Sequence, residues 1–186
     1  FGTIKALGVN PSGPLFFPKL YGRSVLERKQ PWQLTSEEMP YYEQVIELAV
    51  GIDQETLDNP LISDDDLVVK DKEQAINIVS NYILNELMQL WTWNLPEEDS
   101  IGVWVTQVIH HMNGTKTLSC EGLAGRNVFV HTNQIAEDQL IEARKMGCVG
   151  VMTSVSESRY EAFVRHNMPH RPVSRYVSLE PIYTSD

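Results

Sequence analysis

The sequence lacks any apolar stretch long enough to cross a membrane. Its longest strongly apolar run, Val45 to Val50, is interrupted by Glu47, whereas a transmembrane helix needs about 20 consecutive apolar residues. No secretory signal pattern opens the chain. We therefore expect a soluble protein. The first residue is Phe1 rather than Met, which indicates a processed product, a trimmed chain or part of a longer one.

Cysteine is scarce as well. The chain has two cysteines, Cys120 and Cys148, which are too few for a disulfide-stabilised scaffold. Cys148 opens an apolar strand pattern, where a buried free thiol behaves as a small hydrophobic residue. We predict a free thiol at that position.

Nucleotide and calcium motifs are missing. The chain contains neither G-x-G-x-x-G nor G-x-x-x-x-G-K-S/T, the glycine-rich loops that bind dinucleotides and phosphates. An EF-hand loop starting at Asp64 would need glycine at its sixth position and glutamate at its twelfth, where the chain has Val69 and Ala75. We therefore predict no nucleotide cofactor and no calcium site.

The histidines show no metal-binding pattern. His110 and His111 are adjacent in a predicted strand, so their rings should point to opposite faces of a sheet. His166 and His170 have a spacing that suits two ligands on a helix, but Pro169 between them disfavours a continuous helix. We predict no metal site.

Acidic residues are concentrated in the middle of the chain. Residues 1–36 contain five Lys/Arg and one Asp/Glu. Residues 37–99 contain two Lys/Arg and sixteen Asp/Glu, and residues 100–186 contain eight Lys/Arg and eight Asp/Glu. The middle segment would repel a phosphate backbone, which argues against direct sequence-specific binding of nucleic acid. It would suit solubility, or contact with a basic partner.

Residues 1–35 combine turn-forming residues with aromatic ones. Their prolines and glycines disfavour a long helix or a central strand, and their aromatic content is too high for a disordered tail. We predict an extended arm that lies on an apolar surface of its own domain or of a neighbouring subunit. Its contact residues would be Phe16, Phe17, Leu20, Tyr21 and Trp32.

Two helices are predicted in the acidic middle. The first follows Ser36 as its N-cap and ends at Gly51. The second runs from about Lys72 to Leu90, because apolar residues recur there every three or four positions, and Pro96 ends it. Further apolar residues widen this stripe, so we expect the second helix to be packed on more than one side.

A β-hairpin is predicted next. Residues 101–111 are rich in β-branched and aromatic residues, which favour a strand. Asn113-Gly114 is typical of a two-residue type I′ turn, since both residues tolerate a positive φ. The returning strand would cover 116–120.

The C-terminal part predicts alternating strands and helices. Strands are expected at 127–131, 148–154 and 173–179, with helices at 135–146 and 157–166 between them. Thr132 or Asn133 would cap the first of these helices, and Gly147 would end it. Strands separated by helices of this length usually pair in parallel.

Together these elements predict an α+β fold. The extended arm covers residues 1–35, and a single mixed α/β domain covers 36–186. Within this domain we expect a helical acidic part at 36–99, the hairpin at 101–120 and a β-α-β-α-β unit at 126–182.

The ends of the C-terminal strands are a candidate site, because loops and free backbone N–H groups meet at that edge of a parallel sheet. His131, Ser154 and Glu180 could act there as a hydrolase-like or acid–base site. Ser154 lacks the G-x-S-x-G elbow, however, and is also an ordinary helix cap. The polar residues expected at this edge are His131, Thr132, Asn133, Thr153, Ser154 and Glu180.

Our leading hypothesis is a structural subunit, or a processed fragment of one, in a large assembly such as a viral capsid, without catalytic activity of its own. It rests on the missing initiator Met, the aromatic arm and the lack of a recognisable site. Its partners would be other subunits of the same assembly, in a virion or the cytoplasm. Two alternatives remain open: a small α/β enzyme acting at the strand ends, and an acidic adaptor that binds a basic partner.

Overall fold

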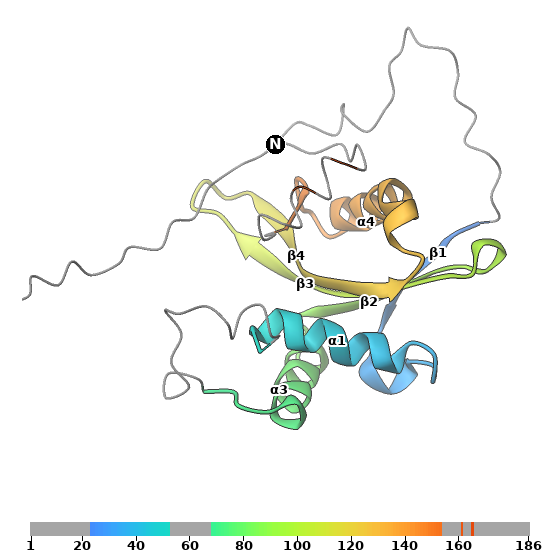
Figure 1. Ribbon diagram of the computed structural model, residues 1–186. Helices are drawn as coiled ribbons and strands as arrows, with labels where there is room; N and C mark the ends of the chain where they lie inside the picture. The colour runs from blue at the N-terminus through green and yellow to red at the C-terminus, as the bar shows by residue number, and fades with distance from the viewer. Residues whose placement is uncertain (1–22, 53–67, 154–160, 162–164, 166–186) are drawn as a thin grey trace, which may run out of the picture.

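The computed structural model describes residues 23–52 and 68–153, together with Glu161 and Arg165, which are helical. Its centre is a five-stranded sheet in the order β1-β2-β3-β4-β5 (Figure 1). Neighbours from β1 to β4 are antiparallel, whereas β5 runs parallel to β4. The strands are β1 (Val25–Lys29), β2 (Gln89–Leu95), β3 (Ser100–His110), β4 (Lys116–Arg126) and β5 (Val151–Thr153).

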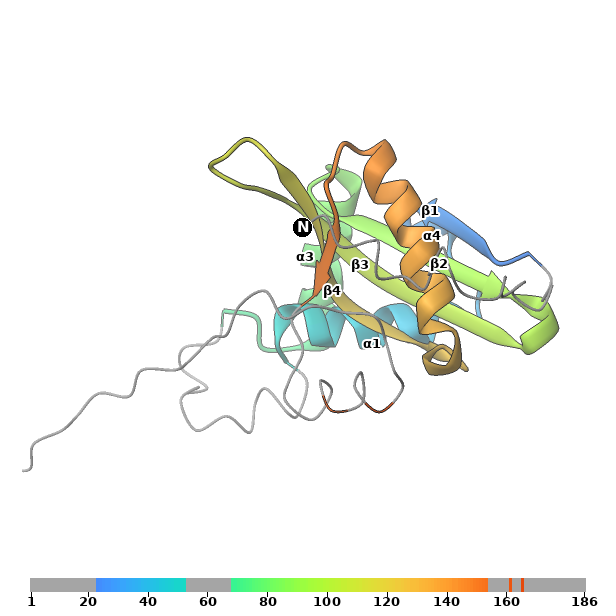
Figure 2. The ribbon, with the colours of Figure 1, turned by 90° about the horizontal axis from the view of Figure 1, so that it is seen from above.

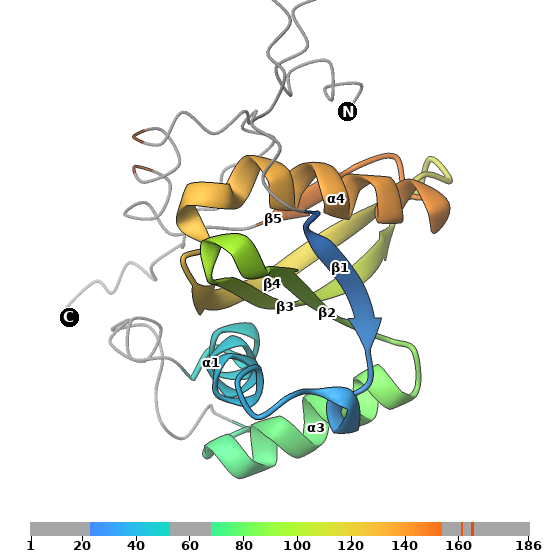
Figure 3. The ribbon, with the colours of Figure 1, turned by 90° about the vertical axis from the view of Figure 1, so that its right-hand side faces the viewer.

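Helices cover both faces of the sheet. α1 (Met39–Val50) and α3 (Lys72–Leu84) lie on one face, and α4 (Thr132–Lys145) lies on the other. Figure 3 shows the resulting three layers, with the sheet between α4 and the α1/α3 pair. The predicted α+β class is confirmed. None of the described helices is both long and apolar enough to cross a membrane.

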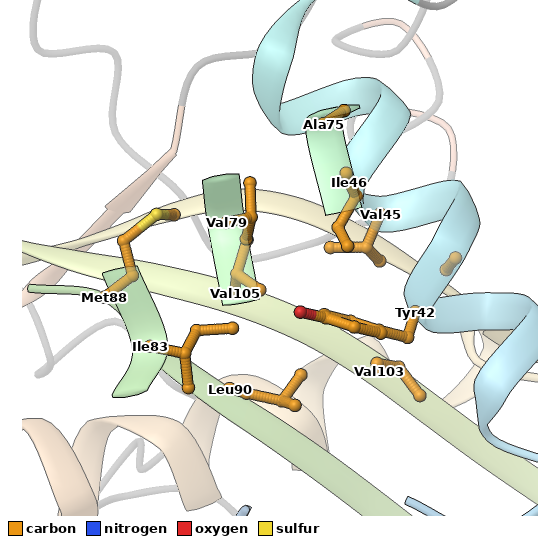
Figure 4. Close-up of a cluster of buried hydrophobic side chains, with 11 residues drawn as sticks. Tyr42, Val45, Ile46, Ala75, Val79, Ile83, Met88, Leu90, Val103 and Val105 are labelled. Atoms are coloured by element: carbon orange, nitrogen blue, oxygen red, sulfur yellow. The ribbon is translucent and has the colours of Figure 1, made fainter. Parts of the chain in front are cut away.

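The first hydrophobic core lies between the sheet and the α1/α3 pair (Figure 4). Its side chains are almost completely buried, and each contributes roughly 1.5–3 kcal/mol to stability. The Tyr42 hydroxyl shares a 2.9 Å hydrogen bond with Ser80 Oγ, which joins α1 to α3. The buried members of this core are Tyr42, Val45, Ile46, Ala75, Val79, Ile83, Met88, Leu90, Val103, Val105 and Ala124.

The second core lies between the sheet and α4 and is built on three tryptophans of β2 and β3. All three are at most 2% exposed, and each indole N–H donates to a side-chain oxygen. Buried indoles need such an acceptor, because an unpaired N–H away from water is costly. The donor–acceptor pairs are Trp91 with Thr106, Trp93 with Asp138 and Trp104 with Gln139.

α1 is preceded by a reciprocal capping arrangement. Glu38 N donates to Thr35 Oγ1 (3.2 Å), and Thr35 N donates to Glu38 Oε1 (2.9 Å). The predicted cap, Ser36, is therefore wrong: α1 begins at Met39 with Glu38 at its N-cap position, and the hydrogen bonds before the helix join Thr35 and Glu38. The predicted end is confirmed, since Gly51 takes the left-handed conformation with φ of 72°.

α3 is shorter than the helix predicted over Lys72–Leu90. It begins after Asp71, which accepts a hydrogen bond from Gln74 N (2.8 Å), and it ends at Leu84. Glu86 then takes a positive φ of 61°, and β2 follows. The helix was predicted too long because β2 is buried on both faces. Its apolar residues do not alternate with polar ones, so in the sequence they resemble a continuation of the apolar stripe of α3.

The predicted hairpin is confirmed, but its connection is longer than two residues. His110 pairs with Lys116, so residues 111–115 join β3 to β4. Gly114 has φ of 84°, whereas Asn113 has a negative φ and accepts the N–H of Thr115 on its side-chain oxygen (3.0 Å). A type I′ turn is therefore wrong, since it needs a positive φ at both central residues.

The strand predicted at 127–131 is wrong. β4 ends at Arg126, Asn127 takes a positive φ of 56°, and Phe129–His131 form the single 3₁₀ turn η5. Val128 is buried, but the next two apolar side chains are exposed. The strand that pairs with β5 in parallel is therefore β4, and the crossover unit is β4-α4-β5.

The helix predicted at 135–146 is confirmed as α4, which starts earlier, at Thr132, and is followed by Gly147 with φ of 80°. The strand predicted at 148–154 is confirmed in shorter form as β5. The strand at 173–179 and most of the helix at 157–166 lie outside the described residues, as does the arm up to residue 22.

Glu38 joins the N-terminal part of the chain to the sheet. It is 2% exposed, and its carboxylate accepts hydrogen bonds from Lys29 Nζ (2.9 Å) and Asn94 Nδ2 (3.3 Å). Burial raises the pKa of this carboxyl, but the hydrogen bonds from Thr35, Lys29 and Asn94 together lower it by more. The pKa therefore lies below its ordinary value of 4.5.

We expect Glu38→Gln to lower the free energy of unfolding by about 2–4 kcal/mol at about pH 7, because it leaves the mostly buried Lys29 without its counter-ion. The pKa of Glu38 is lower in the folded protein than in the unfolded chain. The stabilisation by its carboxylate is therefore complete at pH values above the pKa of the unfolded chain, and it is lost as the pH falls through the pKa of the folded protein. Denaturant titrations at about pH 7 and about pH 3 measure it.

Glu43→Gln is the matched control for this experiment. Glu43 forms an exposed ion pair with Lys72 (2.9 Å), so its loss should cost about 1 kcal/mol or less. The same stability difference between wild type and Glu38→Gln at both pH values would contradict the role assigned to the Glu38 carboxylate.

Candidate functional site

Among the described residues, β4 and β5 pair along the first part of β4. The parallel register joins Leu118 to Val151 and Cys120 to Thr153, the last residue described before Glu161, and β4 continues along β3 as far as Arg126. Figure 2 shows the short β5 beside β4, with α4 lying across the sheet. Among the described residues, no strand pairs with the outer edge of β4 beyond Cys120. We call the backbone edge of residues 121–126 the open edge.

A β-bulge lies where the open edge begins. Cys120 pairs with Thr106 and Gly122 pairs with Val105, so Glu121 has no residue opposite it on β3. A bulge leaves its extra residue unpaired, bends the strand and increases its twist. The bulge therefore lies next to Cys120, which pairs with Thr153, the last residue described before Glu161.

The Glu121 side chain is half-buried at this position. Its carboxylate forms no hydrogen bond or ion pair within the part of the chain that the structure describes. A carboxylate at a strand irregularity, not committed to another side chain, is a suitable proton acceptor for a ligand bound beside it.

Close packing holds the open edge from both faces of the sheet. A Cβ added to Gly122 would lie 3.3 Å from Val45 O and 3.4 Å from Leu48 Cβ, so α1 approaches the strand backbone closely there. On the other face, Cys120 and Leu123 pack against the tryptophan core. The backbone of the open edge is therefore rigidly placed.

Cys120 is unsuited to act as a nucleophile. Desolvation by burial raises the pKa of its thiol to about 11. Because the thiolate is the reactive form, a thiol with this pKa is almost entirely unreactive at neutral pH. Cys148 is also a free thiol, and burial raises its pKa as well, so the prediction of a buried free thiol at Cys148 is confirmed.

The end of the open edge depends on Gly125. A Cβ added there would lie 2.0 Å from Ile101 O and 2.7 Å from Val128 Cγ1, so no larger residue fits without moving the backbone. This contact positions the loop that leads from β4 into α4, because Val128 is the buried anchor of that loop.

Asp99, in the turn between β2 and β3, fixes the start of this loop. Its carboxylate binds Arg126 Nη2 (2.8 Å), and its backbone carbonyl accepts from Asn127 Nδ2 (3.0 Å). Arg126 Nη2 also lies 3.9 Å from Glu37 Oε2. The side-chain hydrogen bond to Asp99 raises the pKa of Arg126, so this guanidinium is charged and paired with acid.

The loop is apolar where it reaches α4. Phe129 is 65% exposed and Val130 is 75% exposed. His131 occupies the N-cap position of α4 without a side-chain cap hydrogen bond, and its ring centre lies 5.8 Å from that of Trp93. Two adjacent apolar side chains are therefore exposed just before α4.

The predicted site residues are only partly described. His131 lies at the start of α4, not at the end of a strand, because residues 127–131 form a turn. Ser154 and Glu180 lie outside the described residues, so their proximity to His131 stays a prediction.

The contact residues predicted for the arm are mostly outside the described part too. Phe16, Phe17, Leu20 and Tyr21 precede residue 23, and Trp32 lies in the turn η2 (Pro31–Gln33) with 69% of its surface exposed. Its role in contacts between subunits stays a prediction.

The neighbouring histidines differ in their surroundings. His110 is exposed, whereas His111 Nε2 shares a 2.9 Å hydrogen bond with Thr117 Oγ1. Across the residues for which the structure gives positions, no group of three His, Cys, Asp or Glu side chains could hold a metal ion.

Glu121 and the open edge were not indicated by any motif in the sequence. The available signal was the pair of glycines, Gly122 and Gly125, since an isolated glycine in a strand pattern suggests a bulge or a close backbone approach. Both glycines lie in β4, and each marks a close approach.

Comparison with known proteins finds similarity in fold without similarity in sequence. No family model matches the chain, and no curated protein matches it. A solved structure of a mutant BH1408 protein from Bacillus halodurans matches 85% of this chain and 99% of its own, with TM-score 0.54 at 14% identity. At this identity the likeness shows a shared fold and no more.

Acetyltransferases are among the other matches. A predicted acetyltransferase from Clostridium acetobutylicum, solved with acetyl-CoA, covers 85% of this chain and 96% of its own at 10% identity, with TM-score 0.47. An aminoglycoside 6′-N-acetyltransferase from Acinetobacter baumannii covers 87% and 100% at 12% identity, with TM-score 0.49.

These matches contradict the prediction of a structural subunit without catalytic activity. The proteins named above include acetyltransferases and no component of a capsid or virion. The prediction of a structural subunit rested on the arm and on the missing initiator Met. Neither feature carries information about the fold of the residues that follow.

We expect Gly125→Ala to lower the free energy of unfolding by about 3 kcal/mol or more, because the new methyl group overlaps Ile101 O and overpacking forces the backbone to shift. Thermal and denaturant unfolding measure the change. Gly150→Ala is the matched control, since a Cβ at Gly150 meets nothing within 4 Å. Equal stability of the two variants would show that β3 and β4 do not approach as closely as described.

Proposed function

We propose that this protein is an acyltransferase that moves an acetyl or similar acyl group from a pantetheine thioester, such as acetyl-CoA, to an amine. The observation that carries the proposal is the open edge: beyond the Glu121 bulge, no described strand pairs with the outer edge of β4. A pantetheine chain has two amide groups, and an extended chain with amides can bind an exposed strand edge through main-chain hydrogen bonds.

The named neighbours support the same class of reaction. Acetyltransferases occur among the solved structures of similar fold, and one of them was solved with acetyl-CoA. The likeness in fold does not itself choose the reaction, so the proposal depends on the open edge and on the groups beside it.

In the proposed reaction, the amine nitrogen attacks the thioester carbonyl carbon, and the C–S bond breaks as the C–N bond forms. The released thiolate takes up a proton, and the amine nitrogen gives up one proton. We expect a backbone N–H at the bulge to donate to the oxygen that becomes negative during attack, since Glu121 lies outside the β3–β4 ladder. Glu121 is placed to accept the amine proton, because its carboxylate lies at the bulge and is not committed to another described residue.

The acyl group passes directly from donor to amine. A covalent intermediate would need a nucleophile at the site, and the Cys120 thiol is held protonated by its pKa of about 11. Cys120 is therefore not the carrier of an acyl group, and in the proposed reaction the amine and the donor are bound together.

The test is an assay of the full chain with acetyl-CoA and a panel of primary amines, following release of free thiol. We expect turnover with at least one amine, above the rate without protein. Absence of turnover across the panel, together with absence of binding of any pantetheine thioester, would overturn the proposal.

We expect Glu121→Gln to lower kcat by about 100-fold or more, because an amide cannot accept the amine proton. KM for the donor should change little, since donor binding uses the backbone. Glu142→Gln is the matched control: Glu142 lies near the far end of α4, paired with Lys145 (2.8 Å), and its change should leave kcat within about twofold. A kcat for Glu121→Gln equal to that of the control would remove Glu121 from the mechanism.

A further inference from the structure

Coenzyme A has two chemically different parts, a pantetheine arm and an ADP with a further phosphate. A pantetheine arm laid along the open edge from Glu121 toward Arg126 would bring the phosphates to the loop of residues 127–131 and the start of α4. The residues of this loop therefore decide whether the phosphates contribute to binding.

The backbone of the loop is poorly suited to phosphate. Phosphate-binding loops are typically rich in glycine, which lets several free backbone N–H groups surround the anion. Residues 127–131 read Asn-Val-Phe-Val-His and contain no glycine. One of their N–H groups, that of His131, already donates to Val128 O (3.0 Å).

The charges around the loop are unfavourable as well. Arg126 is the only Lys or Arg between residues 117 and 143, and Asp99 and Glu37 already pair with it. Asp99 directly follows Glu97 and Glu98 of the turn η4 (Pro96–Glu98), and α4 carries Glu137 and Asp138. Among the described residues, this surface therefore offers a phosphate no cation that is not already paired with acid.

Two of the three exposed residues of the loop are apolar, and the third, Asn127, donates its side-chain amide to Asp99 O. Phe129 and Val130 present most of their surface to solvent next to the open edge. Apolar surface favours contact with carbon-rich parts of a ligand and gives nothing to a phosphate, which keeps its hydration.

On the premise of the acyltransferase function, we propose that this protein recognises its donor through the acyl-pantetheine part and gains no affinity from the phosphates of coenzyme A. Its donors are therefore acyl-pantetheine thioesters as a class, with or without a nucleotide. Asp99 is the residue that sets this preference, because it pairs with Arg126, the cation that directly precedes the loop.

The experiment compares acetyl-pantetheine with acetyl-CoA by calorimetric titration of the full chain at moderate salt. We expect dissociation constants within about threefold of each other. A site that used the phosphates would form charge-assisted hydrogen bonds to acetyl-CoA that acetyl-pantetheine cannot form. Acetyl-pantetheine would then bind about tenfold or more weakly. Acetyl-CoA binding at least about tenfold tighter would overturn this inference and leave the acyltransferase proposal standing.

If neither thioester binds, the acyltransferase proposal fails, and this inference fails with it.

Asp99→Asn gives an independent measurement. Asparagine tolerates the left-handed conformation of this residue (φ of 49°), so the turn is retained while the carboxylate that pairs with Arg126 is removed.

We expect Asp99→Asn to tighten acetyl-CoA binding by about threefold to tenfold and to leave acetyl-pantetheine binding unchanged. Glu142→Gln also removes one negative charge, but near the far end of α4, so it should alter neither of the two dissociation constants. An unchanged ratio of the two constants in Asp99→Asn would overturn the role assigned to Asp99.

Discussion

One extra residue in β4 governs the arrangement of the whole sheet. Side chains alternate between faces along a regular strand, so residues three apart point to opposite faces. Cys120 and Leu123 nevertheless pack against the same tryptophan core, because Glu121 is bulged out of the ladder. The bulge thus keeps both halves of β4 in register with α4. The packing of β4 against α4 is therefore a consequence of this irregularity.

The rigidity of this arrangement comes from α4. Asp138 accepts hydrogen bonds from Trp93 Nε1 (2.9 Å), Ser24 Oγ (2.8 Å) and Gln134 Nε2 (2.9 Å), so one carboxylate ties the helix to β2 and to the start of β1. At the other end of α4, Lys116 Nζ donates to the carbonyl of Met146 (3.2 Å). A helix held at both ends keeps the loop before it in place, and with it the end of the open edge.

Local signals in the sequence predicted what local interactions determine. The α+β class, the hairpin near Gly114, the glycine that ends α1 and the helix over 135–146 follow from turn and capping chemistry, and they are confirmed. β2 was missed because a strand buried on both faces has no alternation to separate it from the preceding helix. The bulge could not be predicted, because it is defined by which residue of β3 lies opposite each residue of β4.

The proposed function would account for the absence of a motif through backbone recognition. Main-chain N–H and C=O groups are the same in every residue, so a site that holds its donor along a strand edge needs almost no particular side chains. What such a site would need is geometry: a bulge, a glycine where strands approach, and an edge without a partner. Among the described residues, Glu121, Gly125 and the residues between them have this geometry. Since phosphate recognition is the part of donor binding that normally leaves a glycine-rich signature, a donor held by pantetheine alone would leave the sequence without one.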